Sequence, residues 1–285
     1  MGHIVGVDVG GTFTDLIVLN ELTGSVNIAK VPSTPENQAF GVLSAINEGN
    51  TPLTDIDSII HGTTVTTNAI LERKISNCGL ITTRGFRDSL ELGRRTRPNP
   101  YGLIGNFECL IPREKRLETT ERMNADGEII TPLDEDEVRV AAKLLLEMGV
   151  ESVVIHFLHS YLNNSHERRA EEIVSEIWPN NFITCGSAVM AEYREYERGT
   201  TGMINASIQP VLDRYIQRLR DELKNKGYGH DLLVMQGNGG TISSKIISKM
   251  AVNTVMSGPA SGVIAAAYTA TVSGYPNVIT CDMGG

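Results

Sequence analysis

A pair of glycines near the amino terminus lies among carboxylates and hydroxyl groups, in the stretch VDVGGTFTD. The backbone N–H groups of Gly10, Gly11 and Thr12 are not covered by large side chains. Backbone N–H groups that point into one turn form a concave site for an anion such as phosphate. The stretch therefore predicts phosphate binding, and a plain hairpin turn is the competing interpretation.

Carboxylates flank the same turn on both sides. Asp8 precedes the glycines, and Asp15 follows them, with the Thr14 hydroxyl just before it. A carboxylate beside a phosphate site can hold Mg²⁺ through water, because Mg²⁺ prefers oxygen ligands and keeps several of its waters. Asp8 is therefore the expected magnesium ligand, and Thr14 and Asp15 are expected to support the site.

The same pattern recurs at the other end of the chain. The stretch NVITCDMGG is again an apolar strand pattern, followed by an aspartate, one residue and a glycine pair. Two such turns in one chain suit a duplicated fold that holds phosphates from two sides. Asp282, Gly284 and Gly285 are therefore the expected second half of the phosphate site.

Hydroxyl groups also gather in the stretch HGTTVTTN, between an expected strand and an expected helix. Such junctions are a usual ligand position in α/β folds. Thr63, Thr64 and Asn68 are therefore candidate substrate-binding residues, and His61 is a candidate catalytic residue. A helix cap formed by either threonine is the alternative explanation for the hydroxyls.

Arginines cluster in one segment of an otherwise acidic chain. Arginine forks suit carboxylate and phosphate groups, so Arg94 and Arg95 are predicted to bind an anionic part of a substrate. A solvated basic face is the alternative. The cluster consists of Arg84, Arg87, Arg94, Arg95 and Arg97.

Strand patterns alternate with helical patterns, which implies α/β architecture with mixed sheets flanked by helices. The glycine pair joins two strands in a hairpin, and a second hairpin follows at ELTG. The clearest helix has Asp134 at its N-cap and ends at Gly149. The other expected helices lie at 35–47, 64–73, 86–93, 164–178, 193–224 and 260–267, and a strand is expected at 278–281.

Composition limits the class of protein. The chain has 285 residues, of which 41% are hydrophobic and 21% charged, as in a soluble globular protein of one or two domains. A net charge of −9 argues against nucleic acid or an anionic membrane as a partner. The four cysteines are far apart and form no CxxC pair, which favours reduced thiols and a cytoplasmic location.

Five stretches together resemble the hydantoinase A/oxoprolinase family of the actin-like ATPase superfamily: DVGGTFTD, HGTTVTTNAILER, TTRGFRDSLELGR, SGPASGV and DMGG. The resemblance covers essentially the whole chain. It implies an actin-like, ribonuclease H-like fold, with a first lobe at 1–190 and the start of a second lobe at 191–285. It also implies that the chain is the amino-terminal part of a longer enzyme, ends inside its second phosphate loop and is inactive alone.

The family resemblance further implies an ATP- and Mg²⁺-dependent enzyme that opens cyclic amides. Transfer of the γ-phosphoryl group of ATP to a lactam carbonyl oxygen gives an imidate phosphate, which water can attack. The implied partners are a B-type subunit or domain and further copies in an oligomer. The nucleotide-binding residues would be Gly10, Gly11, Thr12, Thr14, Asp15, Asp282, Gly284 and Gly285, with Asp8 holding Mg²⁺ through water.

Three other functions are also compatible with the sequence. They are a small-molecule kinase of the same fold, a subunit of an ATP-dependent ketone carboxylase, and a non-enzymatic nucleotide-binding module. The stretch HGTTVTTNAILER disfavours the kinase and the non-enzymatic module, because it resembles the hydantoinase branch. Hydantoin, 5-oxoproline, another lactam and a ketone are all compatible with the sequence.

Overall fold

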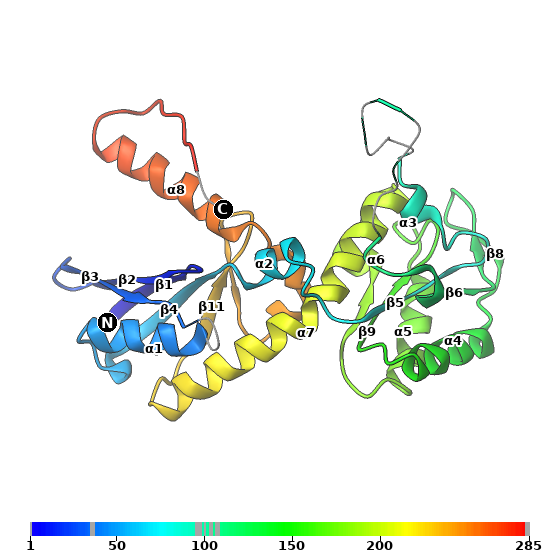
Figure 1. Ribbon diagram of the computed structural model, residues 1–285, viewed down its shortest axis with the longest axis horizontal. Helices are drawn as coiled ribbons and strands as arrows, with labels where there is room; N and C mark the ends of the chain where they lie inside the picture. Colours follow the sequence, from blue (N-terminus) through cyan, green and yellow to red (C-terminus); the bar gives the residue numbers. More distant parts are fainter. Residues whose placement is uncertain are drawn as a thin grey trace. The chain divides into compact units, whose positions relative to one another are not determined.

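The computed structural model describes residues 2–34, 38–94, 99, 101–102, 105 and 109–282. The chain forms two compact units (Figure 1). We call them the first unit, Met1–Lys74 with Val211–Gly285, and the inserted unit, Ile75–Pro210. The expected ranges 1–190 and 191–285 differ from this division, because strands from the last third of the chain join the sheet of the first unit. Those ranges stay a prediction about the lobes of a longer enzyme.

The first unit contains a six-stranded mixed sheet in the order β12-β11-β4-β1-β2-β3. Two antiparallel hairpins, β1–β2 and β2–β3, open the chain as predicted, and β4 and β11 add parallel neighbours. This α/β arrangement confirms the expected fold class. The strands are β1 His3–Val9, β2 Phe13–Asn20, β3 Val26–Pro32, β4 Ile56–Thr63, β11 Leu232–Met235 and β12 Thr241–Ser243.

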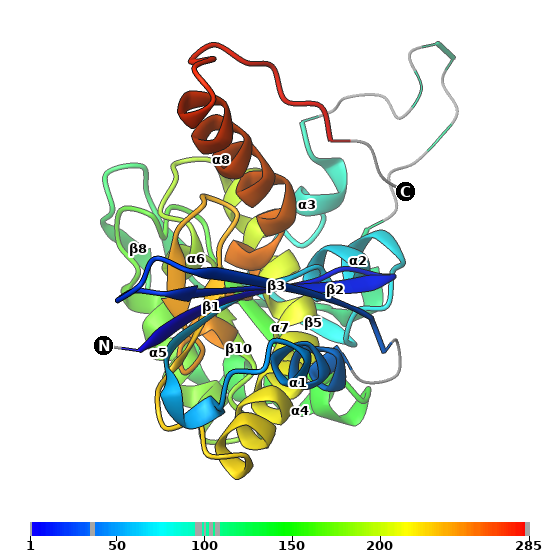
Figure 2. The same cartoon turned by 90° about the vertical axis from the view of Figure 1, so that its left-hand side faces the viewer.

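The two faces of this sheet differ. Val5, Val7 and Val9 of β1 are buried on one face, where they join a core with α1 and with Leu219 and Leu223 of α7. Helix α8 lies over the opposite face, which we call the outer face (Figures 1 and 2). The helices of this unit are α1 Gln38–Glu48, α2 Val65–Leu71, α8 Ser257–Val272 and the second half of α7 Glu195–Asn225.

The inserted unit contains a four-stranded parallel sheet in the order β10-β9-β5-β6. Its helix α4 begins as predicted, because the Asp134 carboxylate accepts a hydrogen bond from the N–H of Glu137. The strands are β5 Cys78–Thr83, β6 Arg116–Thr119, β9 Ser152–His156 and β10 Ile183–Cys185, with the short hairpin β7 Arg122–Met123 and β8 Ile129–Thr131. The helices are α3 Ser89–Leu92, α4 Glu135–Glu147, α5 Ser165–Ser175 and α6 Gly186–Val189.

Two elements differ from the expectation. Helix α3 has four residues, fewer than expected at 86–93. The helix expected at 193–224 is confirmed as α7, with Pro210 inside it, where Ile208 and Leu212 on either side are fully buried. Residues 277–282 form no strand and are exposed, since no described strand pairs with them.

Within the described residues, no single helix is long and apolar enough to cross a membrane. The segments Ile247–Thr254 and Ser257–Val272, bent by 66° at their junction, reach the required length and composition only as a pair.

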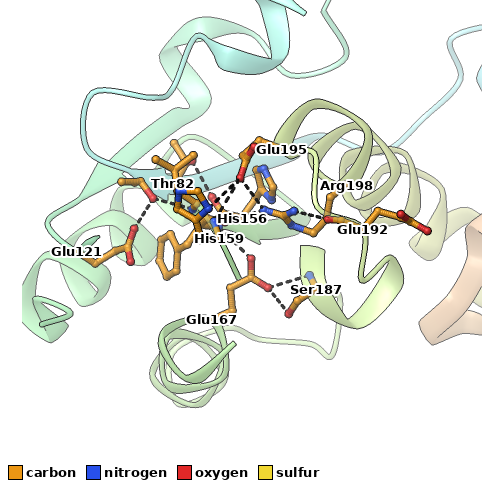
Figure 3. A network of polar contacts seen from close by, with 12 residues as sticks. Thr82, Glu121, His156, His159, Glu167, Ser187, Glu192, Glu195 and Arg198 are labelled. Atoms are coloured by element: carbon orange, nitrogen blue, oxygen red, sulfur yellow. Dashed lines mark hydrogen bonds and ion pairs between the residues drawn. The ribbon is translucent and has the colours of Figure 1, made fainter. Parts of the chain in front are cut away.

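Buried polar side chains form a network at the carboxyl ends of β5 and β9 (Figure 3). Glu167 accepts hydrogen bonds from the N–H of Phe157 at 3.0 Å and from the hydroxyl of Ser187 at 2.6 Å. Arg198 is fully buried and donates to the carbonyl oxygens of Glu192 and Phe157. The network therefore ties α5, α6 and α7 to the ends of the strands.

His156 lies within this network, but neither of its buried ring nitrogens has a hydrogen-bond partner in the described structure. A Cβ atom added at Gly186 or Gly199 would lie 2.8 Å from a ring nitrogen, so the ring packs directly against backbone. Burial and the nearby Arg198 charge lower the pKa of His156 to about 3. The folded chain therefore holds this imidazole in its neutral form.

Stability should depend on this histidine at mildly acidic pH. The unfolded chain takes up a proton below the ordinary pKa of 6.5, whereas the folded chain does not until about pH 3. The free energy of unfolding should therefore fall between these values, by about 1.4 kcal/mol per pH unit for this group. Urea unfolding at pH 7 and pH 5 should show a smaller decrease for His156→Met than for the parent chain. The exposed His230→Gln is the matched control, and an unchanged decrease in His156→Met would contradict the assignment.

Candidate functional site

The register of the first hairpins gathers four residues in one row. Asp8 of β1 lies opposite Asp15 of β2, and Asp15 lies opposite Lys30 of β3. On the other side of β1, Asp8 lies beside Gly62 of β4. Because residues that pair across strands share a face of the sheet, Gly62, Asp8, Asp15 and Lys30 form a row on the outer face. We call it the carboxylate row.

The two carboxylates of this row have different partners. Lys30 Nζ lies 2.8 Å from Asp15 Oδ1, whereas Asp8 has no hydrogen-bond or ion-pair partner among the described residues. Partial desolvation by surrounding protein and the Asp15 charge both raise the pKa of Asp8 above its ordinary value. Asp8 is therefore the carboxylate that is available to a cation.

Gly62 makes room for this carboxylate. A Cβ atom at position 62 would lie 2.8 Å from Asp8 Oδ1 and 3.7 Å from Asp8 Cα. Any larger residue would therefore displace the Asp8 side chain. The absence of a side chain at this position is part of the geometry of the site.

A second row lies one step along the strands from the first. Gly6 of β1 pairs with Ile17 of β2 and with Ile60 of β4, and Ile17 pairs with Ile28 of β3. We call Ile60, Gly6, Ile17 and Ile28 the apolar row. Both rows border a groove of about 580 Å³ on the outer face. The groove is also lined by Met235 and by α8 residues Gly258, Ser261, Gly262 and Ala265.

Helix α8 presents small residues to the groove. Gly258, Ser261, Gly262 and Ala265 recur at helical spacing, so they lie on one face of the helix. Their small side chains leave space between the helix and the sheet. The predicted small-residue helix is therefore present, but most of its surface is exposed, as Figure 2 shows for its outer end.

The glycine turn lies at the end of β1, two residues beyond Asp8. The N–H of Gly10 is used inside the turn, where it donates to the carbonyl oxygen of Phe13 at 3.0 Å. Within the described part of the chain, the N–H groups of Gly11 and Thr12 have no partner. Two of the three predicted N–H groups are therefore free to bind an anion.

Side chains beneath the turn hold its shape. The Ser33 hydroxyl donates to the carbonyl oxygen of Gly10 at 2.8 Å and lies 3.0 Å from the hydroxyl of Thr14. Thr14 is fully buried, so it supports the turn from inside and does not line the groove. Ser33 follows the second hairpin and carries no pattern in the sequence that would predict this role.

The predicted residues of the β4–α2 junction have mainly structural contacts. His61 is fully buried, and its Nε2 atom lies 2.7 Å from the hydroxyl of Tyr215 on α7. Burial lowers the pKa of His61 to about 4. Since His61 lies in the core, on the face of the sheet opposite the groove, it does not reach a ligand directly.

The threonines and Asn68 bond mainly to the junction itself. The Thr63 hydroxyl accepts from the N–H of Val65, and the Thr64 hydroxyl donates to the carbonyl oxygen of Val9. Asn68 donates to Thr64 at 3.4 Å. These contacts fix the turn around Gly62. The Thr63 bond satisfies one amide at the start of α2, whereas Thr64 at the N-cap position makes no side-chain capping bond. The substrate-binding role of these residues stays a prediction.

The remaining predicted residues lie outside this groove or outside the described structure. Arg94 belongs to the inserted unit and forms an ion pair with Glu197, so its guanidinium group is already engaged. Asp282 is exposed in a segment without regular structure. Arg95, Gly284 and Gly285 lie outside the described residues, and their roles stay predictions.

The donors that are present fit a magnesium–phosphate group. Among the described residues, no cluster of three His, Cys, Asp or Glu side chains could enclose a metal ion. A single unpaired carboxylate beside free backbone N–H groups instead suits Mg²⁺ that keeps its waters and is shared with phosphate oxygens. Asp8 with Gly11 and Thr12 offers that arrangement.

Comparison with known proteins identifies relatives along almost the entire chain. Residues 4–178 match the hydantoinase/oxoprolinase N-terminal region, and residues 198–285 match the hydantoinase/oxoprolinase family. The chain is 36% identical to the caprolactamase α subunit of Pseudomonas jessenii, over 99% of this chain and 42% of the relative. It is 33% identical to the acetophenone carboxylase γ subunit of Aromatoleum aromaticum, over 99% of this chain and 41% of the relative.

Solved structures agree with these matches. The ATP-dependent caprolactamase from Pseudomonas jessenii has a TM-score of 0.84 at 35% identity, over 99% of this chain and 42% of that chain. Nucleotide-free acetone carboxylase also has a TM-score of 0.84, at 29% identity, over 96% of this chain and 41% of that chain. The chain thus spans less than half the length of these relatives. On the strength of these matches, it belongs to the hydantoinase/oxoprolinase family.

Proposed function

We propose that this chain supplies the phosphate-binding unit of an ATP- and Mg²⁺-dependent enzyme that opens cyclic amides. The observation that carries the proposal is the Asp8 carboxylate, which has no partner among the described residues, followed three and four residues later by the free N–H groups of Gly11 and Thr12. The proposal is supported by family membership and by the ATP-dependent caprolactamase among the relatives.

The chemistry that needs such a site is the activation of an amide carbonyl. Resonance makes a lactam carbonyl a poor electrophile. Transfer of the γ-phosphoryl group forms a bond between phosphorus and the carbonyl oxygen and breaks the bond to the leaving ADP oxygen. Water then adds to the activated carbon, the C–N bond opens, and inorganic phosphate leaves. Mg²⁺, when bound, neutralises charge on the phosphoryl oxygens.

The residues of this chain contribute position and charge. Gly11 and Thr12 would donate backbone hydrogen bonds to phosphate oxygens, and Asp8 would orient the hydrated magnesium ion. His61 and Tyr215 are positioning residues, because their buried contact supports the strand that carries Gly62. Subunit names among the relatives support a complex with a B-type partner, and a cytoplasmic location stays a prediction.

A second candidate is a subunit of an ATP-dependent ketone carboxylase. It is supported by the acetophenone and acetone carboxylase subunits among the relatives. Phosphorylation of a carbonyl oxygen can precede carboxylation as well as hydrolysis, so the same phosphate site would serve both reactions. Assays with a lactam alone and with a ketone plus bicarbonate would separate the two functions.

Loss of the Asp8 charge should remove the magnesium-dependent step. In the full-length protein, Asp8→Asn should lower both ATP hydrolysis and ring opening by about 10- to 100-fold, the range for outer-shell metal contacts. Asp15→Asn, the neighbouring carboxylate that already pairs with Lys30, should cause a smaller loss. Steady-state rates at varied Mg²⁺ measure this effect. Equal losses in the two variants would argue that Asp8 has no special role.

A side chain at Gly11 should block phosphate without unfolding the chain. A Cβ atom at this position meets no atom within 4 Å, so the fold accommodates it. Gly11→Val would place a branched side chain where phosphate approaches the backbone. ATP hydrolysis should fall by about 10-fold or more while the melting temperature stays near that of the parent. A folded Gly11→Val protein with normal ATPase activity would show that the turn is only a hairpin.

A substitution at Gly62 tests the shape of the site independently of the phosphate-binding turn. Gly62→Ala places a methyl group against Asp8 Oδ1 and should raise the apparent KM for Mg–ATP by about 10-fold. Gly229→Ala is the matched control, because its added methyl group meets no atom within 4 Å and lies away from the groove. Titration of both variants with Mg–ATP gives the comparison. A normal KM in Gly62→Ala would mean that the Asp8 carboxylate tolerates displacement.

A further inference from the structure

We infer that the groove beside Asp8 receives an uncharged substrate with a hydrocarbon body, such as a simple lactam, and disfavours a lactam that carries a carboxylate, such as 5-oxoproline. This inference rests on the proposed function and names its substrate class. It is drawn from the order of polar and apolar rows on the outer face and from the charges that line the groove.

The order of the rows gives a substrate its direction. The free N–H groups of the turn come first, the carboxylate row follows, and the apolar row comes next along the same strands. Successive residues on one face of a strand are about 7 Å apart. A carbonyl oxygen held near Asp8 and the phosphoryl group therefore leaves the rest of a small ring over Ile17 and Ile60.

The apolar row lines the groove with hydrocarbon groups only. Gly6 lies between Ile17 and Ile60, and a Cβ atom at Gly6 would lie 2.9 Å from Ile17 Cγ2. The Ile17 side chain therefore leans over Gly6, and Gly6, Ile17 and Ile60 together line one wall of the groove. Across the groove, Gly262 and Ala265 of α8 add no polar side chain. The methylene groups of a ring can therefore bury apolar surface on both sides.

The charges of the groove oppose an anionic substrate. Its lining contains the carboxylates of Asp8 and Asp15, and none of the described lining residues is a cation. The neighbouring Lys30 is already held by Asp15 at 2.8 Å. The charge of bound phosphates would be compensated by Mg²⁺ and backbone N–H groups, whereas a carboxylate on the ring would have no such partner over the apolar row.

The substrate preference of the protein without substitutions is the first test. The full-length protein, with its partner subunit if ring opening requires one, is assayed with ε-caprolactam and with 5-oxoproline at saturating Mg–ATP. We expect kcat/KM to be about 100-fold or more higher for ε-caprolactam. A preference for 5-oxoproline would overturn the inference and leave the proposed function standing. If neither lactam is opened, the proposed function and the inference both fail.

A cation placed in the apolar row should change this preference. Ile28 is 77% exposed, so Ile28→Arg can be introduced without disturbing the core. The ratio of kcat/KM for ε-caprolactam to that for 5-oxoproline should fall by about 10-fold or more. Val26→Arg is the matched control, because Val26 lies on the same face one step farther along β3 and outside the groove. An unchanged ratio in Ile28→Arg, or an equal change in Val26→Arg, would overturn the placement of the substrate.

Discussion

The alternation of side chains along β1 is the constraint on which the site depends. Val5, Val7 and Val9 are buried against the helices on one face, and this burial fixes Asp8 on the other face. A shift of the strand by one residue would exchange the two sets, with the carboxylate in the core and the valines in water. The burial of the core valines thus determines on which face of the sheet the Asp8 carboxylate lies.

Local patterns in the sequence were sufficient for the parts of the fold that depend on neighbouring residues. The two hairpins, the Asp134 cap and the small-residue helix α8 all follow from short stretches, and the structure contains each of them. The contact between Gly62 and Asp8 did not follow, because it requires β4 to pair in parallel with β1 across a long connection. No local pattern specifies which strand becomes the neighbour.

Charged and polar residues were harder to interpret for the same reason. Arg94 looked available within its local cluster, but its partner Glu197 lies 103 positions away in the sequence. In the sequence, His61 lies next to several hydroxyl-bearing residues. It also lies two residues after the buried Ile59, so the two side chains share the core face of β4. The two-residue period of β4 predicts that His61 is buried, whereas the neighbouring hydroxyl groups suggested that it binds a ligand.

The availability of Asp8 results from competition between two carboxylates for one lysine. Asp8 and Asp15 are cross-strand neighbours, and Lys30 is the cation nearest to them in the register of the sheet. Lys30 projects from β3, which borders β2 and not β1, so it pairs with Asp15, and Asp8 has no counterion among the described residues. Two adjacent negative charges with one compensating cation favour the arrival of another cation. The order of the strands therefore gives one carboxylate that is paired with a lysine and, among the described residues, one that is not, and both lie in the same row beside the glycine turn.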